Sequence, residues 1–193
     1  RKVYEKGFVA ATDGNLSIRE GNLMFITPSG ISKGDVTEEE VLLFEMNNQK
    51  PEGNISTEYK LHLEVYKNRS DINAVVHCHP VYASAFSLKK EALDKHYFPE
   101  VILSLGKIPV CEFAVPSTKE LAESIQPYIK ESRAFLLANH GALTIGVDLK
   151  QAYYRMEKLE HYCNTLFIAQ LLGTPETIPD EKMIILREVA EKT

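Results

Sequence analysis

Hydrophobic and polar residues alternate in several short runs of this chain, a pattern typical of β-strands. Two such runs, residues 16–19 and 23–27, flank Glu20-Gly21-Asn22 and predict a hairpin. The other runs predicted as strands are residues 41–46, 73–79, 101–105, 110–114, 134–138 and 142–145.

Apolar residues at helical spacing separate these strands. The predicted helices cover residues 57–68 with Ser56 as N-cap, 81–88 with Pro80 at the first helical position, and a helix to about residue 130 that starts with a capping box of Ser117 and Glu120. A long helix is predicted with Asp148 as N-cap and with Gly173 and Pro175 at its end, and a short one starts at Asp180. The elements lack the strict βαβ rhythm of a parallel sheet. They favour an α/β sandwich whose sheet is largely antiparallel.

Composition narrows the class of protein. With 193 residues, 44% of them hydrophobic, the chain can form one domain, 1–193, with a sizeable core. The net charge of −5 and the mixed charges exclude a basic nucleic-acid face, and no apolar run is long enough to predict a membrane span. Cys78, Cys111 and Cys163 are odd in number and scattered, which indicates buried thiols in a reducing cytoplasm.

Two histidines one residue apart are the strongest chemical signal. His77 and His79 follow the apolar run 74–76, and on a strand positions i and i+2 point to the same face. Cys78 then points the other way. Paired imidazoles chelate a divalent transition metal and suit zinc, although two polar residues at a surface would give the same pattern.

A third histidine strengthens the metal interpretation. His140 follows the apolar run 133–138 and precedes Gly141, so it lies in the loop after a buried strand, where sites are usually built. Three histidines with one open position are typical of catalytic zinc.

Three segments carry small hydroxyl or amide side chains beside flexible backbone: residues 12–15, 27–30 and 54–58. Such groups can hold a phosphate through N–H and O–H donors. Each segment taken alone also fits an ordinary turn or helix cap, and Glu58 alone fits a first-turn acid favoured by the helix dipole.

Taken together, the motifs resemble those of a known family. Gly14-Asn15-Leu16-Ser17, Thr27-Pro28-Ser29-Gly30, Ser56-Thr57-Glu58, His77-Cys78-His79-Pro80 and Asn139-His140-Gly141 occur in the order found in the class II aldolase and epimerase family. The resemblance covers nearly the whole chain. It implies a three-layer α/β/α sandwich with a mostly antiparallel central sheet, and a homotetramer with active sites at subunit interfaces.

The resemblance also implies roles for the residues in these motifs. The metal ligands would be His77, His79 and His140, holding one Zn²⁺ per subunit, with Mn²⁺ or Co²⁺ fitting the same ligands. Glu58 would be the catalytic acid/base carboxylate and a metal ligand when substrate is absent. The substrate phosphate would be held by Asn15, Ser29, Gly30, Ser56 and Thr57, with Gly14 shaping the first loop.

The implied activity is reversible cleavage of a ketose 1-phosphate, either L-fuculose 1-phosphate or a related deoxyketose phosphate. The products would be dihydroxyacetone phosphate and a short aldehyde. The alternatives are a methylthioribulose-1-phosphate dehydratase, an L-ribulose-5-phosphate 4-epimerase, and a non-catalytic scaffold of the same fold. The epimerase branch carries aspartate where this chain has Glu58, and the scaffold relatives lack the metal ligands.

One position departs from the family pattern. A neighbouring subunit's tyrosine protonates the aldehyde oxygen in the family's fuculose-phosphate enzyme, and Phe113 occupies that position here. Phenylalanine has no proton to donate. Tyr82 and Tyr97 are candidate replacements, although packing roles fit them better. The remaining histidines, His62, His96 and His161, match no motif and are expected to be packed or surface residues.

Overall fold

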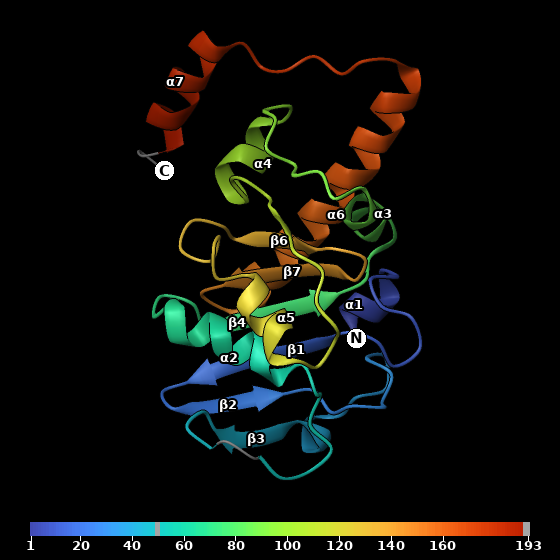
Figure 1. Ribbon diagram of the computed structural model, residues 1–193, viewed down its shortest axis with the longest axis vertical. Coiled ribbons are helices and arrows are strands. Elements are labelled where there is room, and N and C mark those ends of the chain that lie inside the picture. The colour runs from blue at the N-terminus through green and yellow to red at the C-terminus, as the bar shows by residue number, and fades with distance from the viewer. Residues whose placement is uncertain (49–50, 191–193) are drawn as a thin grey trace.

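Seven strands form one sheet in the order β3-β2-β1-β4-β7-β6-β5 (Figure 1). The computed structural model describes residues 1–48 and 51–190. Every neighbouring pair is antiparallel except β5 and β6, which run parallel. The strands are β1 (Asn15–Glu20), β2 (Leu23–Ile26), β3 (Leu42–Glu45), β4 (Ala74–Cys78), β5 (Val110–Cys111), β6 (Ala134–Leu137) and β7 (Gly141–Gly146).

Helices cover both faces of this sheet (Figure 1). They are α1 (Lys2–Glu5), α2 (Tyr59–Asn68), α3 (Val81–Lys89), α4 (Pro99–Ser104), α5 (Lys119–Ser124), α6 (Leu149–Leu172) and α7 (Asp180–Ala190), with a 3₁₀ turn at Glu38–Glu40. Of the helices in the described ranges, none is long and apolar enough to cross a membrane.

The central strand β4 shows why the molecule has three layers. Val76 and Cys78 pack into the core formed with α3 and α6, whereas Val75 packs into the core formed with α2 and α5. A strand buried on both faces is continuously hydrophobic, as this one is up to His77. The predicted α/β/α sandwich with a mostly antiparallel sheet is confirmed, and Cys78 points away from the face that carries His77.

Residues 101–104 belong to helix α4 and Leu105 is its C-cap, so the predicted strand at 101–105 is wrong. Pro99 lies at the first helical position, where its fixed φ suits a helix, and Val101 and Leu105 are buried four residues apart on one face. A run of five mostly apolar residues is too short for its periodicity to distinguish a helix from a strand, so the sequence alone does not decide between them.

Several helix starts and ends also differ from the prediction. Helix α2 begins at Tyr59 with Glu58 at the N-cap position, so Ser56 is not its cap, and Pro80 is the N-cap of α3 and not its first residue. Thr118, not Ser117, caps α5 by accepting the Leu121 N–H.

Two elements are shorter than predicted, and one long helix is confirmed. Helix α5 ends at Ser124, because Pro127 disfavours helical backbone at the residue before it, and the strand at 110–114 contains only Val110–Cys111. The predicted Asp148 cap of α6 is confirmed, because Asp148 accepts the Gln151 N–H, and Gly173 ends that helix.

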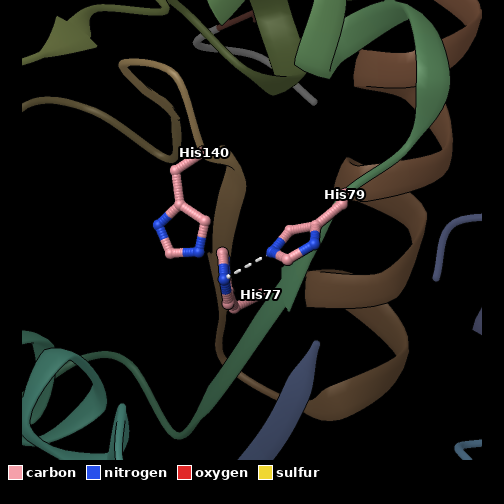
Figure 2. A group of neighbouring side chains, drawn as sticks. All are labelled: His77, His79 and His140. Carbon is pink, nitrogen blue, oxygen red and sulfur yellow. Dashed lines mark hydrogen bonds between the residues drawn. The ribbon is translucent and has the colours of Figure 1, made fainter. Parts of the chain in front are cut away.

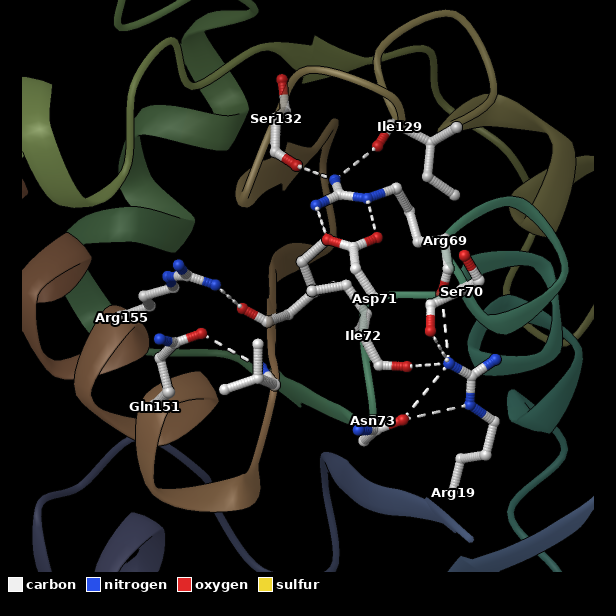
Figure 3. Close-up of polar contacts among 12 residues, drawn as sticks. Arg19, Arg69, Ser70, Asp71, Ile72, Asn73, Ile129, Ser132, Gln151 and Arg155 are labelled. Atoms are coloured by element: carbon white, nitrogen blue, oxygen red, sulfur yellow. Dashed lines mark hydrogen bonds and ion pairs between the residues drawn. The ribbon is translucent and has the colours of Figure 1, made fainter. Parts of the chain in front are cut away.

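At the end of the sheet away from His77, three arginines donate hydrogen bonds to backbone carbonyls (Figure 3): Arg19 to Ser70, Arg69 to Ile129 and Arg155 to Ile145. Arg69 donates to Asp71 through Nε at 2.8 Å and Nη2 at 2.7 Å, and its Nη1 donates to the Ile129 carbonyl at 3.0 Å. This fork holds the pKa of the Asp71 carboxyl at about 2, with the Arg69 hydrogen bonds as the largest cause.

We expect Asp71→Asn to lower the free energy of unfolding by about 1 kcal/mol at pH 7, because it loses the charged hydrogen bonds to Arg69. This is less than the pKa shift of Asp71 alone would give, because water screens a side chain that is largely exposed. The folded pKa of Asp71 lies below its ordinary value of 3.8. The contribution is therefore complete above pH ~4 and lost as the pH falls toward ~2. Urea unfolding of both proteins at pH 7 and pH 3 measures this. Glu123→Gln, in the exposed Lys119–Glu123 pair, is the control and should change stability by under about 0.5 kcal/mol.

Candidate metal centre and active site

His77 lies near the carboxyl end of β4 and is completely buried. Its Nδ1 lies 2.9 Å from the Ala142 carbonyl on the neighbouring strand β7. A carbonyl only accepts, so Nδ1 carries the ring proton. Nε2 is then the atom of this ring that would contact a cation.

His79 and His140 bring their rings against His77 (Figure 2). The Nε2 atoms of His77 and His79 lie 3.2 Å apart. His140 comes from the turn between β6 and β7, after Asn139, whose φ of 56° is left-handed. Asparagine tolerates that backbone better than most residues do. His77 and His79 lie at the end of β4, and His140 lies in the turn before β7. All three histidines are therefore at one end of the sheet.

Glycines let the backbone segments around these rings approach each other closely. A Cβ on Gly141 would lie 2.5 Å from Cδ2 of His79 and 2.7 Å from the Cys78 carbonyl oxygen. Gly14 has φ +71°, and a Cβ there would lie 2.8 Å from the His77 carbonyl oxygen. Neither position has room for a side chain. Glycine at both positions therefore allows β7 and the loop before β1 to lie this close to the strand that carries His77.

Glu58 completes the group from the start of α2. Its Oε2 lies 3.2 Å from Nε2 of His77, and its Oε1 lies 3.3 Å from Nε2 of His140. Asn15 on β1 donates its Nδ2 hydrogen to Oε2 at 2.8 Å. Burial by itself raises the pKa of this carboxyl, but the contacts with His77, Asn15 and His140 together hold it well below its ordinary value. Glu58 is therefore an anion at neutral pH.

The two less buried histidines are neutral at neutral pH. Burial, followed by the charge of His77, lowers the pKa of His140 to about 4 and also lowers the pKa of His79. Asp13 faces His79, with Oδ2 3.7 Å from Nδ1, and its charge raises the pKa of His79 but does not outweigh the burial. Neutral imidazoles keep the lone pairs that bind a metal.

These residues fit a divalent cation. His77, His79 and His140 each offer a ligand atom within 4.8 Å of the others. The Nε2 atoms of His77 and His79 lie 3.2 Å apart, close to the edge of a tetrahedral zinc site, which is roughly 3.3 Å for metal–ligand bonds near 2.0–2.1 Å. Glu58 lies 3.2 Å from His77 through Oε2 and 3.3 Å from His140 through Oε1, so either oxygen is close to the same group. A cation would satisfy these ligand atoms at once, and metal binding by this set stays a prediction.

The predicted phosphate-binding segments lie beside this group and are joined to each other. Ser29 donates its backbone N–H to the Asn54 carbonyl at 2.8 Å, and Asn54 Nδ2 donates to the Ser29 carbonyl at 2.7 Å. Residues 29–30 are thereby fixed against the segment 54–57, which leads directly into Glu58. Thr57 Oγ1 lies 2.5 Å from the Ser117 hydroxyl. No contact joins Ser29 or Gly30 to the histidines among the described residues, so phosphate binding stays a prediction too.

The aromatic candidates take packing positions. Tyr82 packs against Phe167, with ring centroids 5.8 Å apart, and Tyr97 packs on the core. The Phe113 side chain is exposed. None of the three makes a described contact with the histidine group.

His62 was missed as a site residue, because the sequence pattern indicated only a packed or surface position. It is completely buried and contacts Asn15, the residue that donates to Glu58. Its position four residues after Glu58, on the same face of α2, is the sequence signal that could have found it.

Comparison with known proteins assigns this fold and site to a class. Residues 1–167 match the family model of the class II aldolase and adducin N-terminal domain. The chain belongs to the class II aldolase and adducin family, and its fold brings His77, His79 and His140 together. It is an enzyme of the class II aldolase type.

Three proteins that this chain resembles carry the name of the same enzyme. The chain is 37% identical over 171 residues to an L-fuculose phosphate aldolase of Methanococcus maripaludis, covering 87% of this chain and 92% of that one. It is 31% identical over 183 residues to the L-fuculose phosphate aldolase of Escherichia coli, covering 94% and 82%. A solved L-fuculose 1-phosphate aldolase superposes with a TM-score of 0.88 at 33% identity, covering 99% and 90% of the two chains.

Proposed function

We propose that this enzyme cleaves a ketose 1-phosphate, L-fuculose 1-phosphate or a related deoxyketose phosphate, reversibly to dihydroxyacetone phosphate and a short aldehyde. The observation that carries the proposal is the group of His77, His79 and His140, whose ligand atoms lie within 4.8 Å of one another, with the Glu58 carboxylate 3.2 and 3.3 Å from two of them. The names of the relatives support the substrate class.

The residues divide the work of a retro-aldol cleavage. The three histidines would hold a divalent cation, which supplies Lewis-acid stabilisation of the negative charge that develops on the substrate oxygens. Glu58, ionised and held by Asn15, would move the proton at the carbon that gains electron density. The segments 14–15, 29–30 and 56–57 would bind the phosphate and orient the bond that breaks.

The finer assignments belong to the same proposal. Zinc is the metal that a three-histidine set with a carboxylate suits best, with Mn²⁺ and Co²⁺ as replacements. We propose a single domain over 1–193, a homotetramer whose active sites lie at subunit interfaces, and a cytoplasmic location. The three free, buried cysteines are consistent with a reducing compartment. The exposed Phe113 side chain is available to face a neighbouring subunit.

The proposal predicts release of dihydroxyacetone phosphate from at least one ketose 1-phosphate, and loss of that release with chelator. The test is a coupled assay on fuculose, rhamnulose, 5-deoxyribulose and methylthioribulose 1-phosphates, with and without chelator and with added Zn²⁺. Release that chelator leaves unchanged contradicts the metal-dependent mechanism. Water loss from methylthioribulose 1-phosphate to a diketone, without any aldehyde, would instead identify the dehydratase, and interconversion of pentulose 5-phosphates would identify the epimerase.

A further inference from the structure

A ladder of buried polar side chains runs from Glu58 between helix α2 and strand β1. Glu58 and His62 lie four residues apart on one face of α2, and Asn15 and Ser17 lie two residues apart on one face of β1. The two sets interleave. Asn15 lies 2.8 Å from Glu58 and 2.6 Å from His62, and Ser17 lies 2.6 Å from the other nitrogen of His62.

The far end of this ladder is closed by Tyr66, the next residue on the same face of α2. Its hydroxyl lies 2.7 Å from Ser17 Oγ. Asn15, Ser17, His62 and Tyr66 are all at most 4% exposed, so water does not compete for these hydrogen bonds.

The chemistry of each group fixes the direction of the hydrogen bonds. Asn15 Nδ2 donates to the carboxylate, so Oδ1 faces His62 and can only accept. The proton of His62 is therefore on Nε2, and Nδ1 must accept from the Ser17 hydroxyl. Burial keeps His62 neutral by lowering its pKa to about 3, which leaves the ring one donor and one acceptor. All donors along Ser17, His62 and Asn15 thus point toward Glu58.

We propose that His62 is a positioning residue for the reaction: its Nε2–H fixes the Asn15 amide so that the amide hydrogen holds the Glu58 carboxylate in place. The reason is geometric. With Oδ1 held by His62, the Asn15 amide cannot rotate to present oxygen to the carboxylate, which would repel it. In the orientation that this bond holds, Glu58 lies 3.2 Å from His77 and 3.3 Å from His140. This inference rests on the proposed function, in which Glu58 transfers the proton.

The decisive variants are His62→Leu and His62→Gln in the metal-loaded enzyme. We expect His62→Leu to lower kcat by about 10–100-fold, with KM within about threefold and metal content unchanged, because groups that orient a metal-site residue contribute on that scale. Glutamine can donate to Asn15 Oδ1 and accept from Ser17, so His62→Gln should recover most of the lost kcat. A purely structural role would lower thermal stability in both variants without separating kcat from KM.

Tyr66→Phe is the matched control. It removes a buried hydroxyl from the same ladder but leaves the direction of the remaining bonds unchanged, because Ser17 still donates to His62. Stability should fall while kcat stays within about threefold of wild type. Wild-type kcat in His62→Leu, or a loss in Tyr66→Phe as large as that in His62→Leu, overturns the proposal.

A spectroscopic test keeps the inference separate from the proposed activity. In ¹⁵N-histidine-labelled protein, the signals that disappear in His62→Gln belong to His62. They should show the neutral Nε2–H tautomer throughout pH 6–8, and Ser17→Ala should perturb them. An Nδ1–H tautomer would overturn the inference even in an active aldolase. If the wild-type enzyme releases no dihydroxyacetone phosphate, the proposed function fails while the tautomer still tests the ladder.

Discussion

His140→Ala is expected to abolish both stable metal retention and catalysis while leaving a folded protein. His140 is one of three imidazoles that can converge on a cation, and its Nδ1 is buried without a hydrogen-bond partner among the described residues. Truncating the ring therefore removes a ligand and its contact with Glu58, and its Nδ1 has no partner to lose among the described residues. We expect kcat/KM to fall by at least about 10³-fold, because a single donor to a developing oxyanion is already worth about 10²–10³.

Metal content by elemental analysis, kcat/KM and a circular-dichroism melt of the same preparations provide the measurement. His77→Ala should give the same loss of metal with a larger loss of stability, because its ring also donates to the Ala142 carbonyl. His161→Ala is the control for the substitution itself. That residue lies exposed on α6, and its variant should keep metal and rate. Substantial chelator-treated activity in His140→Ala would refute the assignment of the metal ligands.

Glu58→Gln is expected to keep the metal and lose most of the turnover. The three histidines remain, and the glutamine amide occupies the same volume and can still accept from Asn15. It cannot take up or release the proton. General acid–base groups contribute about 10²–10⁴-fold, so kcat should fall within that range while KM changes little.

Steady-state kinetics on the best substrate of the panel, together with the metal-to-protein ratio, test this prediction. Glu64→Gln, a carboxylate on the same helix that contacts Asn68 and Gln126 outside the site, is the matched control and should turn over at nearly the wild-type rate. A near-normal kcat in Glu58→Gln removes Glu58 from proton transfer. Loss of metal together with rate would instead make Glu58 mainly a ligand.

The hydrophobic pattern predicted elements best where it was long or periodic. The β1–β2 hairpin follows from alternation, and α6 with its Asp148 cap follows from helical spacing over many residues. The β6–β7 pair follows from two apolar runs on either side of the His140 turn. The run at 101–105 was assigned wrongly because five apolar residues fit either structure. Only the burial of Val101 and Leu105 on one face makes it α4.

The candidate site divides in the same way. His77 and His79 could be paired from the sequence, because side chains two apart on a strand share a face. The family resemblance added His140, Glu58 and the phosphate segments. The spacing of four residues between Glu58 and His62 was the local signal for His62, but a histidine on an amphipathic helix also fits ordinary packing. Its role depends on hydrogen bonds to β1, 45 and 47 residues away in the chain.

The sequence by itself determined the alternation that makes a two-faced sheet, the pair of histidines at a strand end, and the order of motifs that marks the family. The alternation and the histidine pair depend only on neighbouring residues, and the family is recognised from the order of its motifs along the chain. The tertiary structure alone decided how closely the three histidines approach, how Glu58 reaches two of them, and which way the hydrogen bonds of the Asn15–His62 ladder point. These depend on the packing of α2 against β1 and on the antiparallel pairing of β4 with β7, which bring distant segments within hydrogen-bonding distance.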